Sequence, residues 1–434
     1  MSFTQGLSGL NSSSKDLEVI GNNVANANTV GFKGSVAQFG DVFAAALSGS
    51  GAAQIGIGSK LETVAQQFTQ GNISVTNNTL DMACNGAGFF QLKGPTGNIA
   101  YSRNGQFQLD KNGFIVSSAG HRLQGYAAGA TAVGGAGTQD LQIPTASMPA
   151  TKSSKIGVGM NLDSTSALPT VAAFDPLNAS SYTNATSTTA YDSEGNPLSI
   201  TMYFAKLSPN AWDAYAVVKD KAGNQIYPSP APAAGTWKTS SATGYLGALN
   251  FSAAGINASA LPLPLLPVTG ISFTPPSSPG MPGPVPVTQS LLFDFSTATQ
   301  FAAQFGVTAM TTDGNAQGTL SGFNVSPDGS IVGRYSNGKT QTLGTVALAT
   351  FANMNGLQPL GDNEWVESGA SGPALMGTPG TGLKGLLQTS ATEDSNVDLT
   401  AELVKMITAQ RVYQANAQTI KTQDALMQTL VNLR

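Results

Sequence analysis

The spacing of apolar residues near the C-terminus predicts one long amphipathic helix. Residues 394–434 contain no glycine and no proline, although the whole chain has 50 glycines and 23 prolines. Apolar residues recur there at alternating four- and three-residue steps, which place them along one side of a helix. This C-terminal stripe consists of Leu399, Leu403, Met406, Tyr413, Ala417, Ile420, Met427 and Val431. Only Gln410 and Asp424 interrupt it. An apolar stripe of this length needs a second surface to cover it.

The N-terminus carries a shorter stripe with the same spacing, and the helix that it predicts covers residues 1 to about 28. Its glycines weaken it, since each costs about 1 kcal/mol relative to alanine in a helix. This N-terminal stripe consists of Phe3, Leu7, Leu10, Leu17 and Val24, widened by Ile20. We expect the two stripes to cover each other in a coiled-coil-like pair. Ser395 and Asp398 resemble a capping box at the start of the second helix.

Between the two helices the sequence is typical of short strands and tight turns. Two hairpin-rich blocks, residues 72–145 and 316–390, flank a central insert at residues 146–315. We expect the two blocks to form one middle domain, because the helices outside them must also meet. Residues 1–71 and 391–434 then form an inner helical domain, and the insert forms an outer β domain. The predicted fold class is mainly β with long α-helical termini, arranged as nested domains.

Turn sequences locate the elements within these parts. Polar and glycine-containing turns are expected at residues 102–105, 110–113, 192–196, 327–329 and 336–338. Strands of the insert are expected at residues 198–204, 212–218 and 291–295. Residues 30–71 show no clear period and predict an irregular arm. Prolines crowd residues 262–286, which predicts a surface loop or extended arm.

Charge is scarce in this chain, at 10% of residues against about 25% in an average protein. Low charge suits surfaces that pack against copies of themselves, because each buried charge would need a partner. It is also typical of a secreted β-rich protein with a neutral surface. The net charge of −4 and the absence of a basic cluster argue against nucleic-acid binding. No apolar run approaches the length of about 18 residues that suggests a membrane span.

Residues suited to catalysis or metal binding are few. His121 is the only histidine, and no nucleophile motif surrounds it, so we expect an exposed turn residue. No histidine or cysteine spacing predicts a metal site, and paired carboxylates have no positive support. Cys84 alternates with Leu80 and Met82, which predicts a buried thiol on a strand. The sequence therefore predicts no catalytic, cofactor or metal site.

Two long motifs resemble the bacterial flagellar rod and hook protein family. The first motif, at residues 20–33, reads IGNNVANANTVGFK. The second lies within residues 395–434 and contains SNVDL, QRVYQ, NAQTIKTQD and LVNLR. The hairpin sequence YSRNGQF at residues 101–107 resembles a domain that the family shares. The resemblance covers both termini and the hairpin blocks, and it is closer to the hook members than to the rod members.

This resemblance implies a structural subunit of an axial tube and no enzyme. Subunits of the family are exported by the flagellar type III export apparatus without loss of a signal peptide. They polymerise under a hook cap protein into a tube that connects the distal rod protein to a hook-filament junction protein. The resemblance places the terminal helices inside the tube, the hairpin domain in its middle layer and the insert outside. The extracellular tube is then a flexible universal joint that transmits torque from rod to filament.

The N-terminus agrees with such an export route, because it lacks the basic region and continuous apolar run of a cleavable signal peptide. We expect an assembly interface made of the two stripes, together with Ile20, Asn22, Asn23 and Asn26. The three asparagines have two interpretations: hydrogen bonds between helices, or capping of the first helix. We expect the terminal helices to be disordered in a free subunit and to fold when subunits stack.

Two alternatives remain. A distal rod protein of the same family shares these termini, but the length of the insert argues against it. A secreted adhesin or enzyme is the alternative from another class of protein.

Overall fold

The structure is a computed structural model. It describes residues 3–42, 56–129, 137–144, 146–171, 174–219, 225–226, 244–257 and 291–432. The chain forms two compact units. The first comprises residues 1–145, 321–334 and 340–434, and the second comprises residues 146–320 and 335–339. The predicted proline-rich arm at residues 262–286 lies outside the described residues.

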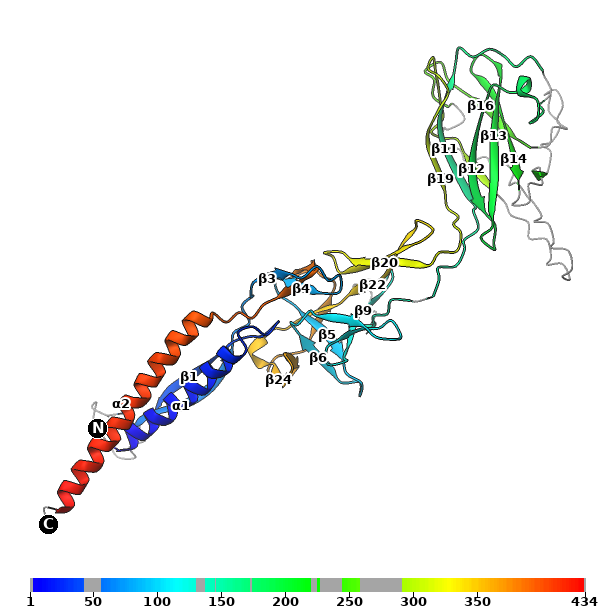
Figure 1. Ribbon diagram of the computed structural model, residues 1–434. Coiled ribbons are helices and arrows are strands. Elements are labelled where there is room, and N and C mark those ends of the chain that lie inside the picture. Colours follow the sequence, from blue (N-terminus) through cyan, green and yellow to red (C-terminus); the bar gives the residue numbers. More distant parts are fainter. Residues whose placement is uncertain are drawn as a thin grey trace. The chain divides into compact units, whose positions relative to one another are not determined.

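Two helices from opposite ends of the chain lie side by side in the first unit (Figure 1). They are α1 (Phe3–Ala25) and α2 (Leu399–Asn432), and they run antiparallel. The carboxylate of Asp398 accepts hydrogen bonds from the amides of Thr400 and Ala401, at 2.9 and 3.2 Å. Asp398 therefore caps α2 itself, and the predicted capping box beginning at Ser395 is wrong. Helical ends joined to a mainly β chain are confirmed.

Residues 30–71 are not an irregular arm. They contain β1 (Ser35–Val42) and β2 (Gly58–Gln66), which pair antiparallel as a two-stranded sheet beside α1. A bulge between Gln38 and Phe39 shifts the register of this pair. The shift breaks the strict alternation of side chains, which explains why the sequence shows no clear period there.

Strands from both hairpin blocks form one 13-stranded sheet in the first unit. Its main path is β20-β21-β22-β9-β5-β6-β25-β24, so early and late segments of the chain are neighbours. The early strands are β5 (Phe89–Lys93), β6 (Ile99–Ser102), β7 (Phe107–Leu109), β8 (Ile115–Ser117), β9 (Arg122–Ala127) and β10 (Gln139–Asp140). The late strands are β20 (Leu320–Val325), β21 (Ser330–Tyr335), β22 (Thr340–Val346), β23 (Leu348–Thr350), β24 (Gln358–Gly361), β25 (Glu364–Val366) and β26 (Leu375–Gly377).

Two short strand pairs connect this sheet to the helices. β4 (Met82–Asn85) pairs with β27 (Leu386–Thr389), and β3 (Ile73–Val75) pairs with β28 (Ala391–Glu393). β3 follows the β1–β2 hairpin and β28 precedes α2. The segments next to the two terminal helices are therefore joined by β pairing.

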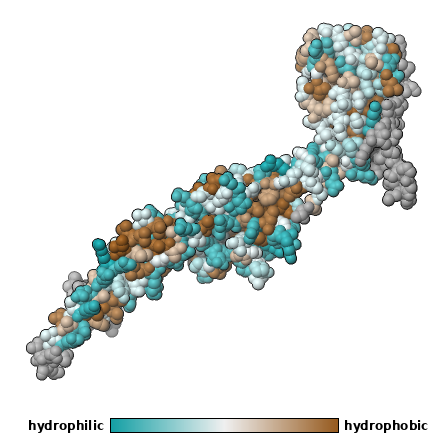
Figure 2. All heavy atoms as spheres, in the orientation of Figure 1, coloured by the Kyte–Doolittle hydropathy of each residue, from teal (hydrophilic) through white to brown (hydrophobic). Residues whose placement is uncertain are grey.

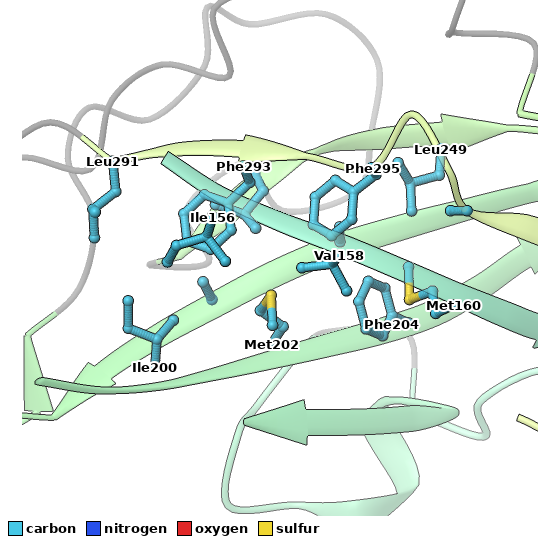
Figure 3. Close-up of a cluster of buried hydrophobic side chains, with 14 of the residues drawn as sticks. Ile156, Val158, Met160, Ile200, Met202, Phe204, Leu249, Leu291, Phe293 and Phe295 are labelled. Carbon is cyan, nitrogen blue, oxygen red and sulfur yellow. The ribbon is translucent and has the colours of Figure 1, made fainter. Parts of the chain in front are cut away.

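The second unit contains two sheets that face each other across an apolar core (Figure 3). β11 (Lys155–Asp163) pairs along one edge with the parallel strands β17 (Leu292–Asp294) and β18 (Thr299–Phe301), and along the other edge with the antiparallel strand β19 (Gly306–Thr312). The other sheet contains β12 (Asn184–Tyr191), β13 (Pro197–Ser208), β14 (Ala211–Lys219), β15 (Gln225–Ile226) and β16 (Tyr245–Asn250). Alternate residues of β11 and β13 fill the core, because successive side chains of a strand point to opposite faces.

Most of the predicted turns connect paired strands. The turns at residues 110–113 and 336–338 join β7 to β8 and β21 to β22. The turn at residues 102–105 is different, because β6 pairs with β5 and β25 instead of β7. His121 is also not the exposed turn residue that we expected. Its Nδ1 lies 2.8 Å from the Oε1 of Glu364, and its side chain is mostly buried.

Candidate assembly surface

Small residues of α1 allow α1 and α2 to approach closely. A Cβ on Gly9 would lie 2.9 Å from the amide of Asn416, and a Cβ on Gly6 would lie 3.1 Å from the Cγ1 of Ile420. The glycines thus allow the two helices to approach closely. The buried residues of this covered face are Gly6, Ser13, Ile20 and Asn23 on α1, with Glu402 and Ala409 on α2.

The N-terminal stripe lies beside the covered face. The buried positions 6, 13, 20 and 23 of α1 each stand one residue before a position of the predicted spacing, namely 7, 14, 21 and 24. One residue turns a helix by about 100°, so the stripe points to the side of α2 instead of at it. Phe3 and Leu7 are exposed, and Leu10, Leu17 and Val24 are half-buried. Among the apolar residues of the N-terminal stripe, only Ile20 is buried.

The C-terminal stripe is likewise covered only in part. Met406, Ala417 and Ile420 are half-buried, whereas Leu399, Leu403, Tyr413 and Met427 are exposed. The side chain of Val431 lies outside the described residues. Within one chain the two stripes therefore cover each other only in part. Glycine, serine and alanine form the closer contact, and the larger apolar side chains remain beside it.

The β1–β2 hairpin covers another side of α1, and this contact is polar. Gln5 Nε2 donates to the carbonyl of Gly56 at 2.6 Å, and the hydroxyls of Ser12 and Ser59 are 2.9 Å apart. Serine is compatible with this close approach because its side chain is short. The hairpin therefore contacts polar residues of α1, while Phe3 and Leu7 remain exposed.

The three asparagines divide between the two interpretations. Asn23 is buried, donates to the carbonyl of Ser35 at 2.7 Å and to the Oε2 of Glu402 at 3.4 Å, and so connects α1 with β1 and α2. Asn26 instead donates to the carbonyl of Asn22 at 3.0 Å and to its side-chain oxygen at 2.7 Å. Asn22 and Asn26 thus close the end of α1 locally, while Asn23 forms the contact between helices.

Apolar side chains beyond the predicted stripes are exposed on the same part of the molecule. Figure 2 shows hydrophobic patches in brown over the helical part of the first unit. Further exposed apolar residues are Val404, Ile407, Val412 and Leu426 on α2, with Val36, Phe39, Leu61 and Val64 on the β1–β2 hairpin. Together with the exposed stripe residues they form what we call the apolar surface. Patches of this kind on a soluble chain mark sites of protein–protein interaction.

A buried ionic junction fixes the point where both chain ends meet the sheet. The carboxylate of Glu393 accepts from Lys33 Nζ at 2.6 Å and from Arg103 Nη1 at 3.1 Å. It also accepts from the amide of Gly71 at 3.0 Å, while its backbone carbonyl accepts from the amide of Gly31 at 2.7 Å. All three charged side chains are at most 3% exposed. We call Lys33, Arg103 and Glu393 the ionic junction.

The surroundings of the ionic junction are tightly packed. Gly31 has a φ of +72°, and a Cβ there would lie 2.6 Å from the amide nitrogen of Asn104. Burial lowers the pKa of Lys33, an effect that the nearby Glu393 opposes. Burial also raises the pKa of the Cys84 thiol, which lies on β4 as expected. The thiol is therefore a core group.

Sequence reasoning missed both the small-residue contact and the ionic junction. Gly6 and Gly9 were interpreted as weak points of a helix, although their three-residue spacing places them on one face. Lys33 and Glu393 each lie inside or beside the two family-like motifs. In a chain with only 20 basic and 24 acidic residues, a charge within a motif was the available signal.

The described residues offer no metal site and no membrane-spanning helix. They contain no cluster of three or more histidine, cysteine, aspartate or glutamate side chains arranged to hold a metal ion. None of the helices described has the length and apolar character needed to cross a membrane.

Known families match successive parts of the chain. "Flagella basal body rod protein" matches residues 5–33, and "Flagellar hook protein FlgE/F/G D1 domain" matches residues 83–160. "Flagellar basal body protein FlaE D2 domain" matches residues 161–315, and "Flagellar basal body rod FlgEFG protein C-terminal" matches residues 388–433.

Individual proteins match over the full length. The flagellar hook proteins FlgE of Escherichia coli strain K12 and Salmonella typhimurium strain LT2 are each 40% identical over 437 residues, covering 100% of both chains. The crystal structure of the Helicobacter pylori flagellar hook protein FlgE2 is 14% identical, with a TM-score of 0.49 over 73% of this chain and 99% of that chain. The full-length identity to the two FlgE proteins shows that the chain belongs to the flagellar hook protein FlgE family, as a structural subunit of the flagellar hook.

Proposed function

We propose that subunits polymerise into the hook through the apolar surface of the terminal helices and the β1–β2 hairpin. One observation carries this proposal: α1 and α2 already pair closely at small residues, yet many of their larger apolar side chains stay exposed. Leu403 is 43% exposed and Ile407 is 52% exposed. Full burial of such a side chain contributes about 1.5–3 kcal/mol, so several per subunit favour association strongly.

The proposed interface contains the residues expected from the sequence, with two different roles. The exposed and half-buried stripe residues contact neighbouring subunits. Of the remaining residues, Ile20 and Asn23 on α1 and Ile420, which packs against Gly6, hold α1 against α2 within a subunit instead. Asn22 and Asn26 fix the end of α1. The terminal helices become fully ordered only when neighbouring subunits cover them.

We further propose that the three nested parts take three radial positions in the tube. The helical ends, residues 1–71 and 391–434, form the inner layer, and the hairpin blocks, residues 72–145 and 316–390, form the middle layer. The insert, residues 146–315, forms the outer layer. Sparse charge on the insert suits neighbouring inserts that slide as the tube bends, so that the tube acts as a universal joint.

The specific partners follow from the family. We propose contacts with a hook cap protein during growth, a distal rod protein at one end and a hook-filament junction protein at the other. Export by the flagellar type III apparatus without a cleavable signal peptide places the subunit outside the cell. The adhesin and enzyme alternatives have no feature of the described residues in their favour.

Assembly by purified protein tests the proposal. Full-length protein should form tubes visible by electron microscopy, whereas a variant lacking residues 1–25 and 399–434 should remain monomeric with a folded insert. Tubes from the truncated variant would contradict the proposal.

Two further experiments test the other parts of the proposal. A hydrolase screen on the same preparations tests the enzyme alternative. Cysteine cross-links between adjacent inserts test bending, because they should stiffen the tube.

A further inference from the structure

The ionic junction lies between the sheet of the first unit and both terminal helices. Gly31 and Lys33 follow α1 directly, and Glu393 closes β28 shortly before α2 begins. Arg103 follows β6 and belongs to the sheet region. Glu393 lies on the segment that leads to α2. Its carboxylate contacts Lys33 and Arg103, and its backbone carbonyl accepts from the amide of Gly31, so this one residue contacts both the segment that leaves α1 and the sheet region.

The charges in the ionic junction do not balance. Two cations, Lys33 and Arg103, share the one carboxylate of Glu393. The remaining hydrogen bonds of the cations go to carbonyl oxygens: Lys33 Nζ donates to Thr69 at 2.7 Å, and Arg103 donates to Gly86 at 2.8 Å and to Cys84 at 3.2 Å. The guanidinium of Arg103 also lies over the Phe89 ring, 5.2 Å from its centroid. The Nε of Arg103 is buried without a hydrogen-bond partner among the described residues. Charge supplied by Glu393 therefore holds two buried cations that would otherwise repel each other.

This imbalance makes the members of the ionic junction unequal. Loss of Lys33 leaves one cation paired with one carboxylate. Loss of the Glu393 charge leaves two buried cations side by side, with carbonyl oxygens and the Phe89 ring as partners but no negative charge. A purely steric role for Glu393 would show no such asymmetry, because glutamine has nearly the same shape.

We propose that Glu393 is the positioning residue through which both terminal helices are held on the β-sheet, and that its charge makes the subunit competent for assembly. The inference rests on the proposed function, in which the helices carry the assembly contacts. It adds a requirement that lies outside the apolar surface. The helices must leave the sheet together and in a fixed direction before their apolar residues can meet those of a neighbour.

Four full-length variants test this role: Glu393→Gln, Lys33→Met, the double variant Lys33→Met/Glu393→Gln, and Glu364→Gln. The last is a matched control, since Glu364 is also a buried carboxylate of the first unit but pairs with His121. Each variant is examined by hydrogen exchange of the monomer and by tube formation at equal protein concentration. Peptides covering residues 28–40, 68–75 and 386–398 report on the ionic junction, and peptides from β13 and β14 report on the second unit.

We expect Glu393→Gln to speed amide exchange about 100-fold or more in the three peptides of the ionic junction, the scale for a buried pair that loses one partner. The β13 and β14 peptides should be unchanged, and tube formation should be lost. Lys33→Met should have the smaller effect. The double variant should exchange more slowly than Glu393→Gln, because it removes the repulsion between the two cations.

The outcomes separate this inference from the proposed function. Two results would overturn the role of Glu393. One is an unchanged exchange rate in Glu393→Gln. The other is an increase in exchange rate in the double variant that equals the sum of the increases in the two single variants. If exchange rises but tubes form normally, the junction stands and assembly through the helices fails. If Glu393→Gln does not fold, folding of the double variant decides. A double variant that folds would show that removing Lys33 relieves the repulsion between the cations. A double variant that also fails to fold, while Glu364→Gln folds, would overturn the role of Glu393.

Discussion

Gly9 and Asn416 touch across the antiparallel helix pair so closely that a single added carbon would meet the asparagine amide at 2.9 Å. The contact shows that a glycine within a helix has a packing role here. The same glycines were the reason to regard the N-terminal helix as weak. Gly9 lowers the helix propensity of α1, but its lack of a side chain permits the close contact with α2.

Substitution of Gly9 by alanine should therefore weaken the helix pair, although alanine favours the helix by about 1 kcal/mol. Gly21→Ala is the matched control, because a Cβ there meets nothing within 4 Å. Thermal melting followed by circular dichroism at 222 nm should show stabilisation by Gly21→Ala and loss of stability by Gly9→Ala. Adding Asn416→Ala to Gly9→Ala should restore part of that loss. Equal stabilisation by both alanines would show that the helices do not pack at Gly9.

A charge on the apolar surface should block assembly and leave the monomer intact. We expect Leu403→Glu to change the free energy of unfolding by only about 0.5 kcal/mol, as is usual for an exposed site. Tube formation should fall sharply, because the glutamate would be buried without a partner. Thr408→Glu places the same charge at an exposed polar position of α2 and should be milder. Sedimentation of assembled material measures the difference, and equal assembly by the two variants would argue against the apolar surface.

Asp16 should make the helix pair less stable at neutral pH than at acidic pH. Burial raises its pKa above the ordinary 3.8, and the negative Glu402 adds to the rise while Lys405 opposes it. The folded state therefore holds this proton more tightly than the unfolded chain does. The stability that this proton contributes is present below pH 3.8 and is lost as the pH rises through the raised pKa.

The variant Asp16→Asn isolates this contribution. Its helices should melt at a higher temperature than those of the unmodified chain at pH 7, and the difference should disappear as the pH falls below 3.8. Glu18→Gln, which removes an exposed carboxylate from the same helix, controls for the change in net charge. A difference between Asp16→Asn and the unmodified chain that does not vary with pH would contradict this account.

The core of the second unit should be separable from assembly through the helices. Trp212 is completely buried between the two sheets of that unit. Trp212→Ala should cost about 3–5 kcal/mol, as large aromatic truncations do. Calorimetry should show this loss in the transition of the second unit, while the ionic-junction peptides keep their slow exchange. Loss of both together would show that the two units unfold as one.

The sequence was most informative where periodicity is strict and least informative where small residues or charges decide the packing. Hydrophobic spacing predicted both helices, and turn sequences predicted the β7–β8 and β21–β22 hairpins. The covered face of the helices was misplaced by one residue, because apolar spacing says nothing of how closely Gly6 and Gly9 admit a neighbour. The β1–β2 hairpin was missed because a bulge disrupts its alternation.

The spacing of residues could not predict contacts between charged residues that are far apart in the sequence. Lys33 and Glu393 are 360 positions apart, and no local pattern connects them. His121 and Glu364 are a second example, 243 positions apart. Both pairs depend on pairing between early and late strands: Glu393 lies on β28, which pairs with β3, and Glu364 lies on β25, which pairs with β6. That topology can be suspected from the helical ends, but its register depends on the folded backbone.

Oxidative footprinting of methionine tests most directly whether the apolar surface is bare in the subunit and covered in the tube. Met427 on α2 is 64% exposed, and Met82 on β4 is completely buried, so one chain contains both the probe and its control. Met427 should oxidise readily in the monomer and become protected in the tube, while Met82 stays protected in both. Equal oxidation of Met427 before and after assembly would contradict the account.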